Sequence, residues 1–219
     1  MRPFSQTLGQ RFGAMSRRAA ITGAALAAMT TLAACGGAGG GGGATALEGD
    51  MAIGAPEGAK VTVVEYASVT CGACAAWQAS TYDAFKAKYI DTNQIRFVFR
   101  ELPTGPMDVA AAGFLTARCA GEDQYFNVVH EIMASQSEIF SGQARPMLVR
   151  VANAAGLSEE QFSQCVSDPD NIAALEARVR QAAEAGINGT PTFLINGERL
   201  VGPPTLEALS EAIDAELAK

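Results

Sequence analysis

The stretch VVEYASVTCGAC, residues 63–74, places two cysteines two residues apart, directly after an apolar run that contains a single acid. The run from Val61 to Ala67 has the continuous apolar pattern of a strand buried on both faces. From Ala73 to Tyr89 the apolar residues recur at helical spacing. We therefore expect Cys71 at a junction of strand and helix. There the unpaired backbone N–H groups and the helix dipole favour a thiolate over a thiol.

The rest of the chain places this junction in a larger pattern. Residues 95–99 read as a second strand, so strand, helix and strand form a βαβ crossover with parallel strands. Residues 103–187 are rich in alanine and show helical periodicity, with helix caps predicted at Ser158 and Asp168. Residues 191–196 predict a strand, Asn196-Gly197 a hairpin turn, residues 199–201 a partner strand and residues 206–217 a closing helix. The predicted order is βαβ, an all-helical insertion, and ββα.

The cysteine pair is a candidate reagent for thiol-disulfide exchange. Cys74 lies one helical turn beyond Cys71 and is expected to face the interior, where it could resolve a mixed disulfide formed at Cys71. Glu65 is either at the rim of the sheet or a buried proton acceptor that serves Cys74. Pro191 begins a strand and is a candidate cis proline after Thr190, whose backbone would then face the two sulfurs.

Four features together resemble the DsbA family of thiol-disulfide oxidoreductases: Glu65 six residues before Cys71, the sequence Cys71-Gly72-Ala73-Cys74, the helical insertion, and the segment 189–197, GTPTFLING. The resemblance implies an α/β thioredoxin-like fold, formed by residues 45–102 and 188–219, with an all-helical subdomain at 103–187. By position it implies that Cys71 is the nucleophile, Cys74 the resolving cysteine and Glu65 the proton-handling acid. It further implies that cis Pro191, with Thr190 beside it, contacts substrate.

The function that this resemblance implies is the introduction of disulfides into exported proteins, with a membrane redox partner similar to DsbB. One departure affects the direction of electron flow. The best-known oxidases of the family have Pro-His between the cysteines, whereas this chain has Gly72-Ala73. A Cys71 pKa that is higher by one or two units makes the Cys71–Cys74 disulfide a milder oxidant by roughly 30–60 mV. An isomerase or reductase of the same fold is therefore the alternative, but those isomerases carry an extra N-terminal domain or stalk, and we expect a monomer.

The N-terminal residues predict export. Residues 1–34 contain four arginines, no acid and an uncharged run from Ala19 to Ala34, which is typical of a signal peptide that could begin at Met1 or Met15. Ser16-Arg17-Arg18 partly matches a twin-arginine signal. The run ends in Leu-Ala-Ala before Cys35, which resembles a lipobox, so Cys35 is the predicted lipidation site and the glycine-rich residues 35–44 a tether. We therefore expect a periplasmic, membrane-anchored lipoprotein.

Composition and the remaining cysteines limit the other possibilities. All 23 acids follow Cys35, whereas only 12 of the 16 basic residues do, which leaves the mature chain with a net charge of −11 and argues against a nucleic-acid partner. Cys119 and Cys165 could be small buried residues, but an oxidising compartment favours a structural disulfide, and some DsbA relatives carry an extra one there.

The remaining side chains give little support for a metal or cofactor. His130, the only histidine, fits a helix packing position better than a catalytic one. One histidine and one cysteine pair are a poor supply of metal ligands, so we expect neither a metal nor a cofactor. A Cu(I)- or thiol-binding lipoprotein without turnover is the alternative from another functional class.

Overall fold

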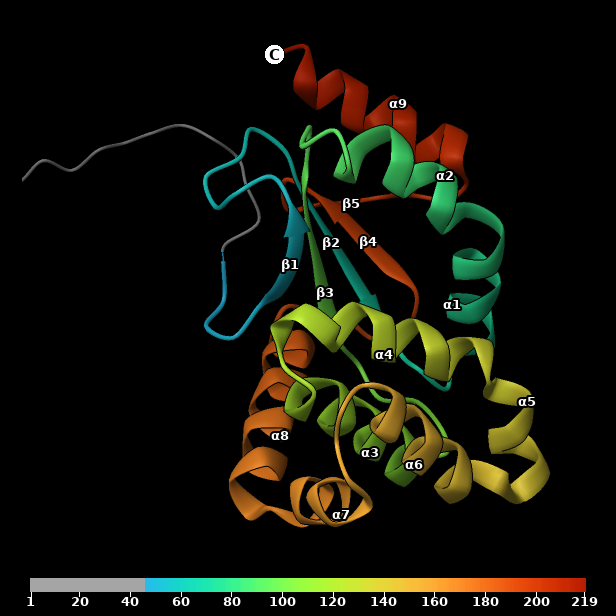
Figure 1. Cartoon of the computed structure of the whole chain (residues 1–219). Coiled ribbons are helices and arrows are strands. Elements are labelled where there is room, and N and C mark those ends of the chain that lie inside the picture. Colours follow the sequence, from blue (N-terminus) through green and yellow to red (C-terminus); the bar gives the residue numbers. More distant parts are fainter. Residues whose placement is uncertain (1–45) are drawn as a thin grey trace, which may run out of the picture. The chain divides into compact units, whose positions relative to one another are not determined.

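A five-stranded mixed sheet organises residues 46–219, which are the residues that the computed structural model describes (Figure 1). The strand order is β1-β3-β2-β4-β5. Strand β2 is parallel to β3 and antiparallel to β4, while β1 pairs antiparallel with β3 and β5 with β4. All six residues of β2 are buried, as its apolar sequence predicts. The strands are β1 (Met51–Gly54), β2 (Thr62–Ala67), β3 (Arg96–Glu101), β4 (Thr192–Ile195) and β5 (Glu198–Arg199).

A continuous helical run connects β2 to β3 and packs beside the C-terminal helix (Figure 1). The run comprises α1 (Gly72–Trp77), η1 (Gln78–Tyr82), α2 (Asp83–Phe85) and η2 (Lys86–Ile90), where η1 and η2 are π-helical turns. The C-terminal helix is α9 (Leu206–Leu217). The Tyr89 hydroxyl donates to Asp214 at 2.8 Å, which ties the end of the run to α9. The predicted βαβ crossover is therefore present, and it places Cys71 directly before α1.

The helices between β3 and β4 gather at the end of the sheet toward which β2 and β3 run (Figure 1). Both predicted helix caps are confirmed. Ser158 and Gln161 form a capping box, and the Asp168 side chain accepts from the N–H groups of Asp170 and Asn171. The elements of this region are α3 (Met107–Cys119), α4 (Glu122–Ala134), α5 (Gln136–Glu138), η3 (Ile139–Gln143), α6 (Ala144–Ala154), α7 (Glu159–Ser167) and α8 (Pro169–Glu184).

The thioredoxin-like fold with a helical insertion, predicted from the sequence, is confirmed, with one strand added. The pattern did not predict β1, because a strand of four residues, of which Met51 is buried and Gly54 is exposed, is too short to show a clear period. The hairpin turn lies at Asn196 and Gly197, both with positive φ, as the Asn-Gly pair predicts. The predicted signal segment, the lipidation site Cys35 and the glycine-rich tether lie outside the described residues. Within residues 46–219, no helix has both the length and the apolar character needed to span a bilayer.

A buried carboxylate at the end of β3 fastens the helical insertion to the sheet. The Glu101 side chain is fully buried, and it accepts from the guanidinium of Arg118 on α3 at 2.5 Å and from that of Arg178 on α8 at 2.6 Å. The hydroxyl of Tyr125 on α4 donates to it at 3.1 Å. One strand residue thus binds three helices of the insertion. A buried charge with several partners costs far more to disrupt than a surface ion pair.

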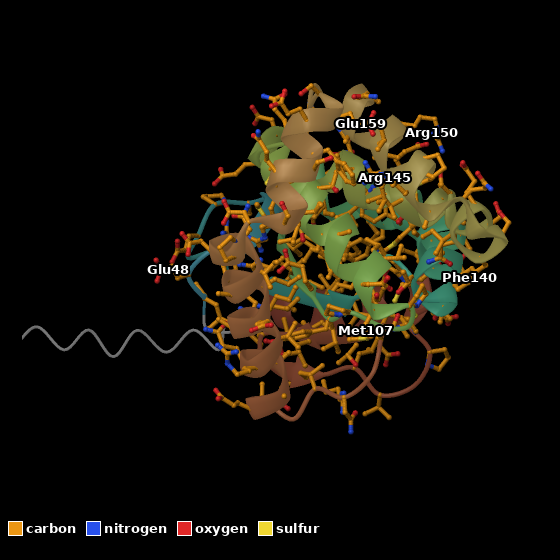
Figure 2. The ribbon with its side chains drawn as sticks, turned by 90° about the horizontal axis from the view of Figure 1, so that it is seen from below. Glu48, Met107, Phe140, Arg145, Arg150 and Glu159 are labelled. Atoms are coloured by element: carbon orange, nitrogen blue, oxygen red, sulfur yellow. A yellow bond between two sulfur atoms is a disulfide. The ribbon has the colours of Figure 1, made fainter. Side chains whose placement is uncertain are left out.

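We predict that Glu101→Gln lowers the free energy of unfolding by about 3–5 kcal/mol, because two largely buried guanidinium groups lose their counter-charge. Urea denaturation measures this loss. The matched control is Glu159→Gln, which breaks an ion pair with Arg145 in which both side chains are more than 60% exposed (Figure 2). The control is expected to cost less than about 1 kcal/mol. Equal losses in the two variants would contradict the role given to Glu101.

Candidate active site

The turn between β2 and α1 presents Cys71 as the N-cap residue of the helix. The backbone of Cys71 is extended, with φ −82° and ψ 117°. Its N–H donates to the Ser68 carbonyl at 3.1 Å, and its own carbonyl accepts the first helical hydrogen bond from Ala75 at 3.1 Å. This conformation directs the sulfur at the N–H groups of the first helical turn, which have no partner within the helix.

The Cys71 sulfur accepts a hydrogen bond from the backbone N–H of Cys74 at 3.4 Å. Its pKa is lowered from 9.0 to about 5, chiefly by hydrogen bonding with the Cys74 thiol. The Thr190 side chain and the backbone N–H groups of Cys74 and Ala73 lower it further, whereas burial opposes the shift. Ionisation of Cys71 therefore stabilises the folded, reduced protein. This contribution is complete above about pH 9 and is lost as the pH falls through about 5.

Cys74 lies in the opposite environment. It is fully buried, and its pKa is raised, first by the hydrogen bond that it gives to Cys71 and then by burial. At neutral pH the pair therefore holds one thiolate and one thiol. Such a split between neighbouring groups assigns different chemical roles: Cys71 can attack or leave as a thiolate, while Cys74 needs a proton acceptor or donor when it reacts.

Glu65 supplies a titratable group beneath the pair. Of the two positions that the sequence allowed, the structure gives the buried one, because Glu65 is only 4% exposed in the centre of β2. Its neighbours across the sheet are Phe99 and Phe193. Burial, followed by the negative charge on Cys71, raises the pKa of Glu65 to about 8. Glu65 is thus largely protonated at neutral pH and near the range in which it can exchange a proton.

The distant segment that contains Pro191 closes over the sulfur. The peptide bond between Thr190 and Pro191 is cis, and the Thr190 carbonyl oxygen lies 3.5 Å from the Cys71 sulfur. Strand β4, which begins at Thr192, holds this segment in place by pairing with β2. The Trp77 ring, on the active-site helix, packs 4.8 Å from Phe193. The structure therefore brings together all five predicted residues of the redox centre, from Glu65 to Pro191.

A hydroxyl network that the sequence analysis did not identify shapes the turn before Cys71. The Ser68 hydroxyl accepts from the Thr104 N–H at 3.0 Å, and the Thr70 hydroxyl donates to the Thr104 carbonyl at 2.9 Å. Ser68 and Thr70 are both buried. The available signal was two hydroxyl residues in an otherwise apolar run directly before the first cysteine. Thr104, 33 residues beyond Cys71 in the sequence, carries no such signal.

The remaining cysteines and the histidine lie outside this centre. Cys119 and Cys165 are joined by the expected disulfide, which links α3 to α7, and Cys71 and Cys74 are the free cysteines of residues 46–219. His130 lies on α4 with its ring 4.3 Å from that of Tyr82, and burial lowers its pKa to about 4. It is a neutral packing residue. Among the described residues, no three His, Cys, Asp or Glu side chains are grouped so that they could hold a metal ion.

Comparison with known proteins is consistent with this geometry. A protein from Rickettsia conorii, provisionally named a protein-disulfide oxidoreductase, is 34% identical over 173 residues, which are 78% of this chain and 61% of the relative. The chain spans about three fifths of the length of this relative and of the similar proteins from other Rickettsia species.

Solved structures share the fold, and two of them illustrate the likeness. The structure of α-DsbA1 from Wolbachia pipientis has a TM-score of 0.71 at 24% identity, over 79% of this chain and 93% of that one. Oxidised BdbD from Bacillus subtilis has a TM-score of 0.73 at 18% identity, over 81% of this chain and 97% of that one. The Thioredoxin_4 family model, described as thioredoxin, matches residues 46–215. The chain therefore belongs to the thioredoxin family, and it shares the fold of the DsbA structures, with a helical insertion.

Proposed function

We propose that this protein is a thiol-disulfide oxidoreductase that introduces disulfides into exported proteins. The observation that carries the proposal is the unequal cysteine pair. The Cys71 sulfur accepts the Cys74 N–H and has a pKa of about 5, while Cys74 is a fully buried thiol. A low-pKa cysteine is a good leaving group in thiol-disulfide exchange. The site therefore suits a disulfide that is readily passed on.

The proposed reaction begins with a Cys71–Cys74 disulfide. A substrate thiolate attacks the Cys71 sulfur, which forms a mixed disulfide and releases Cys74, and Cys74 takes up a proton that Glu65 can supply. A second substrate thiolate then attacks the substrate sulfur of the mixed disulfide, and Cys71 leaves as a thiolate. The substrate loses two electrons and gains a disulfide, while the enzyme gains the two electrons and ends with Cys71 as a thiolate and Cys74 as a thiol. The reaction needs no cofactor beyond the cysteine pair.

The direction of electron flow follows from which enzyme form is more stable. Stabilising the Cys71 thiolate stabilises the reduced enzyme, and this makes its disulfide more oxidising. That favours disulfide donation over the alternative isomerase or reductase function. Each cycle leaves the enzyme reduced, so the proposal includes a membrane redox partner, similar to DsbB, that takes up the two electrons.

We propose an unfolded polypeptide as the substrate, and three exposed apolar side chains are candidates for contact with it. Met107 is 57% exposed at the start of α3, and Phe140 is 63% exposed in η3 (Figure 2). Val201, in the segment between β5 and α9, is 91% exposed. Met107 follows the loop that contains Thr104, which contacts the turn before Cys71.

We expect the oxidised protein, at stoichiometric concentration, to accelerate the refolding of a reduced, disulfide-containing protein. Cys71→Ser should reduce the rate to the uncatalysed value, because it removes the attacked sulfur. Cys74→Ser is the matched control: it keeps the Cys71 thiolate, which should attack the disulfide of an oxidised substrate and, without Cys74 to release it, remain as a mixed disulfide that non-reducing electrophoresis detects. Equal refolding rates with wild type and Cys71→Ser would reject the enzyme proposal and leave Cu(I) or thiol binding as the function.

We also propose that the protein acts as a monomer in the periplasm, anchored by lipid on Cys35, since a membrane anchor would place the domain beside its redox partner. In bacteria that produce the full chain, wild type is expected to partition into the detergent phase of a Triton X-114 extract, and Cys35→Ser into the aqueous phase. Aqueous partitioning of both would reject the anchor and leave the redox proposal unaffected.

A further inference from the structure

Gln136 connects the helical insertion to the turn that carries Cys71. It is the first residue of α5, and its side-chain amide Nε2 donates two hydrogen bonds. One goes to the Val69 carbonyl at 2.8 Å and the other to the Cys71 carbonyl at 3.0 Å. The two acceptors flank Thr70, so a single amide group spans the turn. Both N–H bonds of that amide are used in these contacts.

The contact to Val69 matters because that residue is fully buried. Among residues 46–219, the Gln136 amide provides a hydrogen bond to the Val69 carbonyl. A buried carbonyl without a hydrogen-bond partner destabilises the fold. On its other side, the Val69 side chain packs against α3, where a Cβ added at Gly113 would lie 2.9 Å from Val69 Cγ2. The turn is therefore held between α3, which packs against the Val69 side chain, and α5, from which Gln136 donates its hydrogen bonds.

We propose that Gln136 is a positioning residue of the redox centre, which holds the carbonyls of Val69 and Cys71 so that the Cys71 sulfur meets the Cys74 N–H. The proposal rests on the redox function argued above for Cys71 and Cys74. It gives the helical insertion a part in the chemistry, since α5 belongs to the insertion while the sulfur belongs to the thioredoxin-like domain. Gln136 itself contacts no reacting atom.

The physical consequence is a less stable thiolate when the amide is lost. Without Gln136, the Val69 carbonyl would lose its hydrogen bond and the Cys71 carbonyl would keep only the helical bond from the Ala75 N–H, so the turn would no longer hold the sulfur at 3.4 Å from the Cys74 N–H. The titratable groups that act on Cys71 are Cys74 on α1 and Glu65 on β2, and neither is changed by a substitution at Gln136. A carboxylate at position 136 would in addition repel both the carbonyl oxygens and the thiolate.

The test is the pH profile of iodoacetamide alkylation of the reduced protein, because the rate follows the thiolate fraction of Cys71. Gln136→Met keeps the length of the side chain and removes both donors. We expect a rise of about half to one unit in the apparent pKa, which lowers the rate below that pKa by about three- to tenfold. Gln136→Glu should produce a larger shift in the same direction. Gln94→Met is the matched control, because the Gln94 amide also donates to a backbone carbonyl, that of Lys88, at 2.9 Å.

A merely structural role would lower the melting temperature of the Gln136 variants and leave their alkylation profiles as in wild type. That result would overturn the proposal, as would an equal shift in the Gln94 control. Alkylation requires no turnover. A wild-type protein that fails to catalyse refolding would therefore reject the oxidoreductase function without affecting this test, and unchanged profiles would reject the role of Gln136 without affecting the oxidoreductase function.

Discussion

The contact between the Cys71 sulfur and the backbone N–H of Cys74 is the interaction on which the redox centre depends. The contact forms because the fully buried strand β2 ends a short turn before α1, and Cys71 occupies the N-cap position of that helix. The sulfur takes the place of the hydroxyl or carboxylate that usually caps a helix. Since the cap is strongest when it is charged, the helix favours the thiolate, and the negative charge is held close to the protein surface.

The surrounding elements keep the titratable neighbours of the Cys71 thiolate uncharged. Cys74 and Glu65 are both buried, and burial opposes their ionisation, so the site holds one negative charge at a defined atom. The Thr190 carbonyl closes the other side of the sulfur. The helical insertion adds rigidity from two directions: Glu101 binds its helices to the sheet, and Gln136 binds α5 to the turn. The insertion is thus a structural support of the centre.

Structural features that depend on a local sequence pattern could be predicted from the sequence. The buried strand, the strand-to-helix junction at Cys71, the capping box at Ser158 and the Asn196-Gly197 turn each follow from a rule that acts within a few residues. The short strand β1 and the contacts of Thr104, Gln136 and Glu101 could not be predicted. Their partners are tens of residues away, and a threonine, glutamine or glutamate in a polar stretch looks like any other surface residue until the fold brings it to its partner.

The most direct test of the account is titration of the reduced protein, followed by the ultraviolet absorbance of the thiolate. The account predicts one cysteine that ionises with a midpoint near pH 5, and this transition should be absent in Cys71→Ser. Cys74 should show no ionisation in the same range, because its pKa is raised. A wild-type protein in which thiolate absorbance first appears near the ordinary cysteine value of 9.0 would contradict the central claim, because the turn would then give Cys71 no advantage over an ordinary thiol.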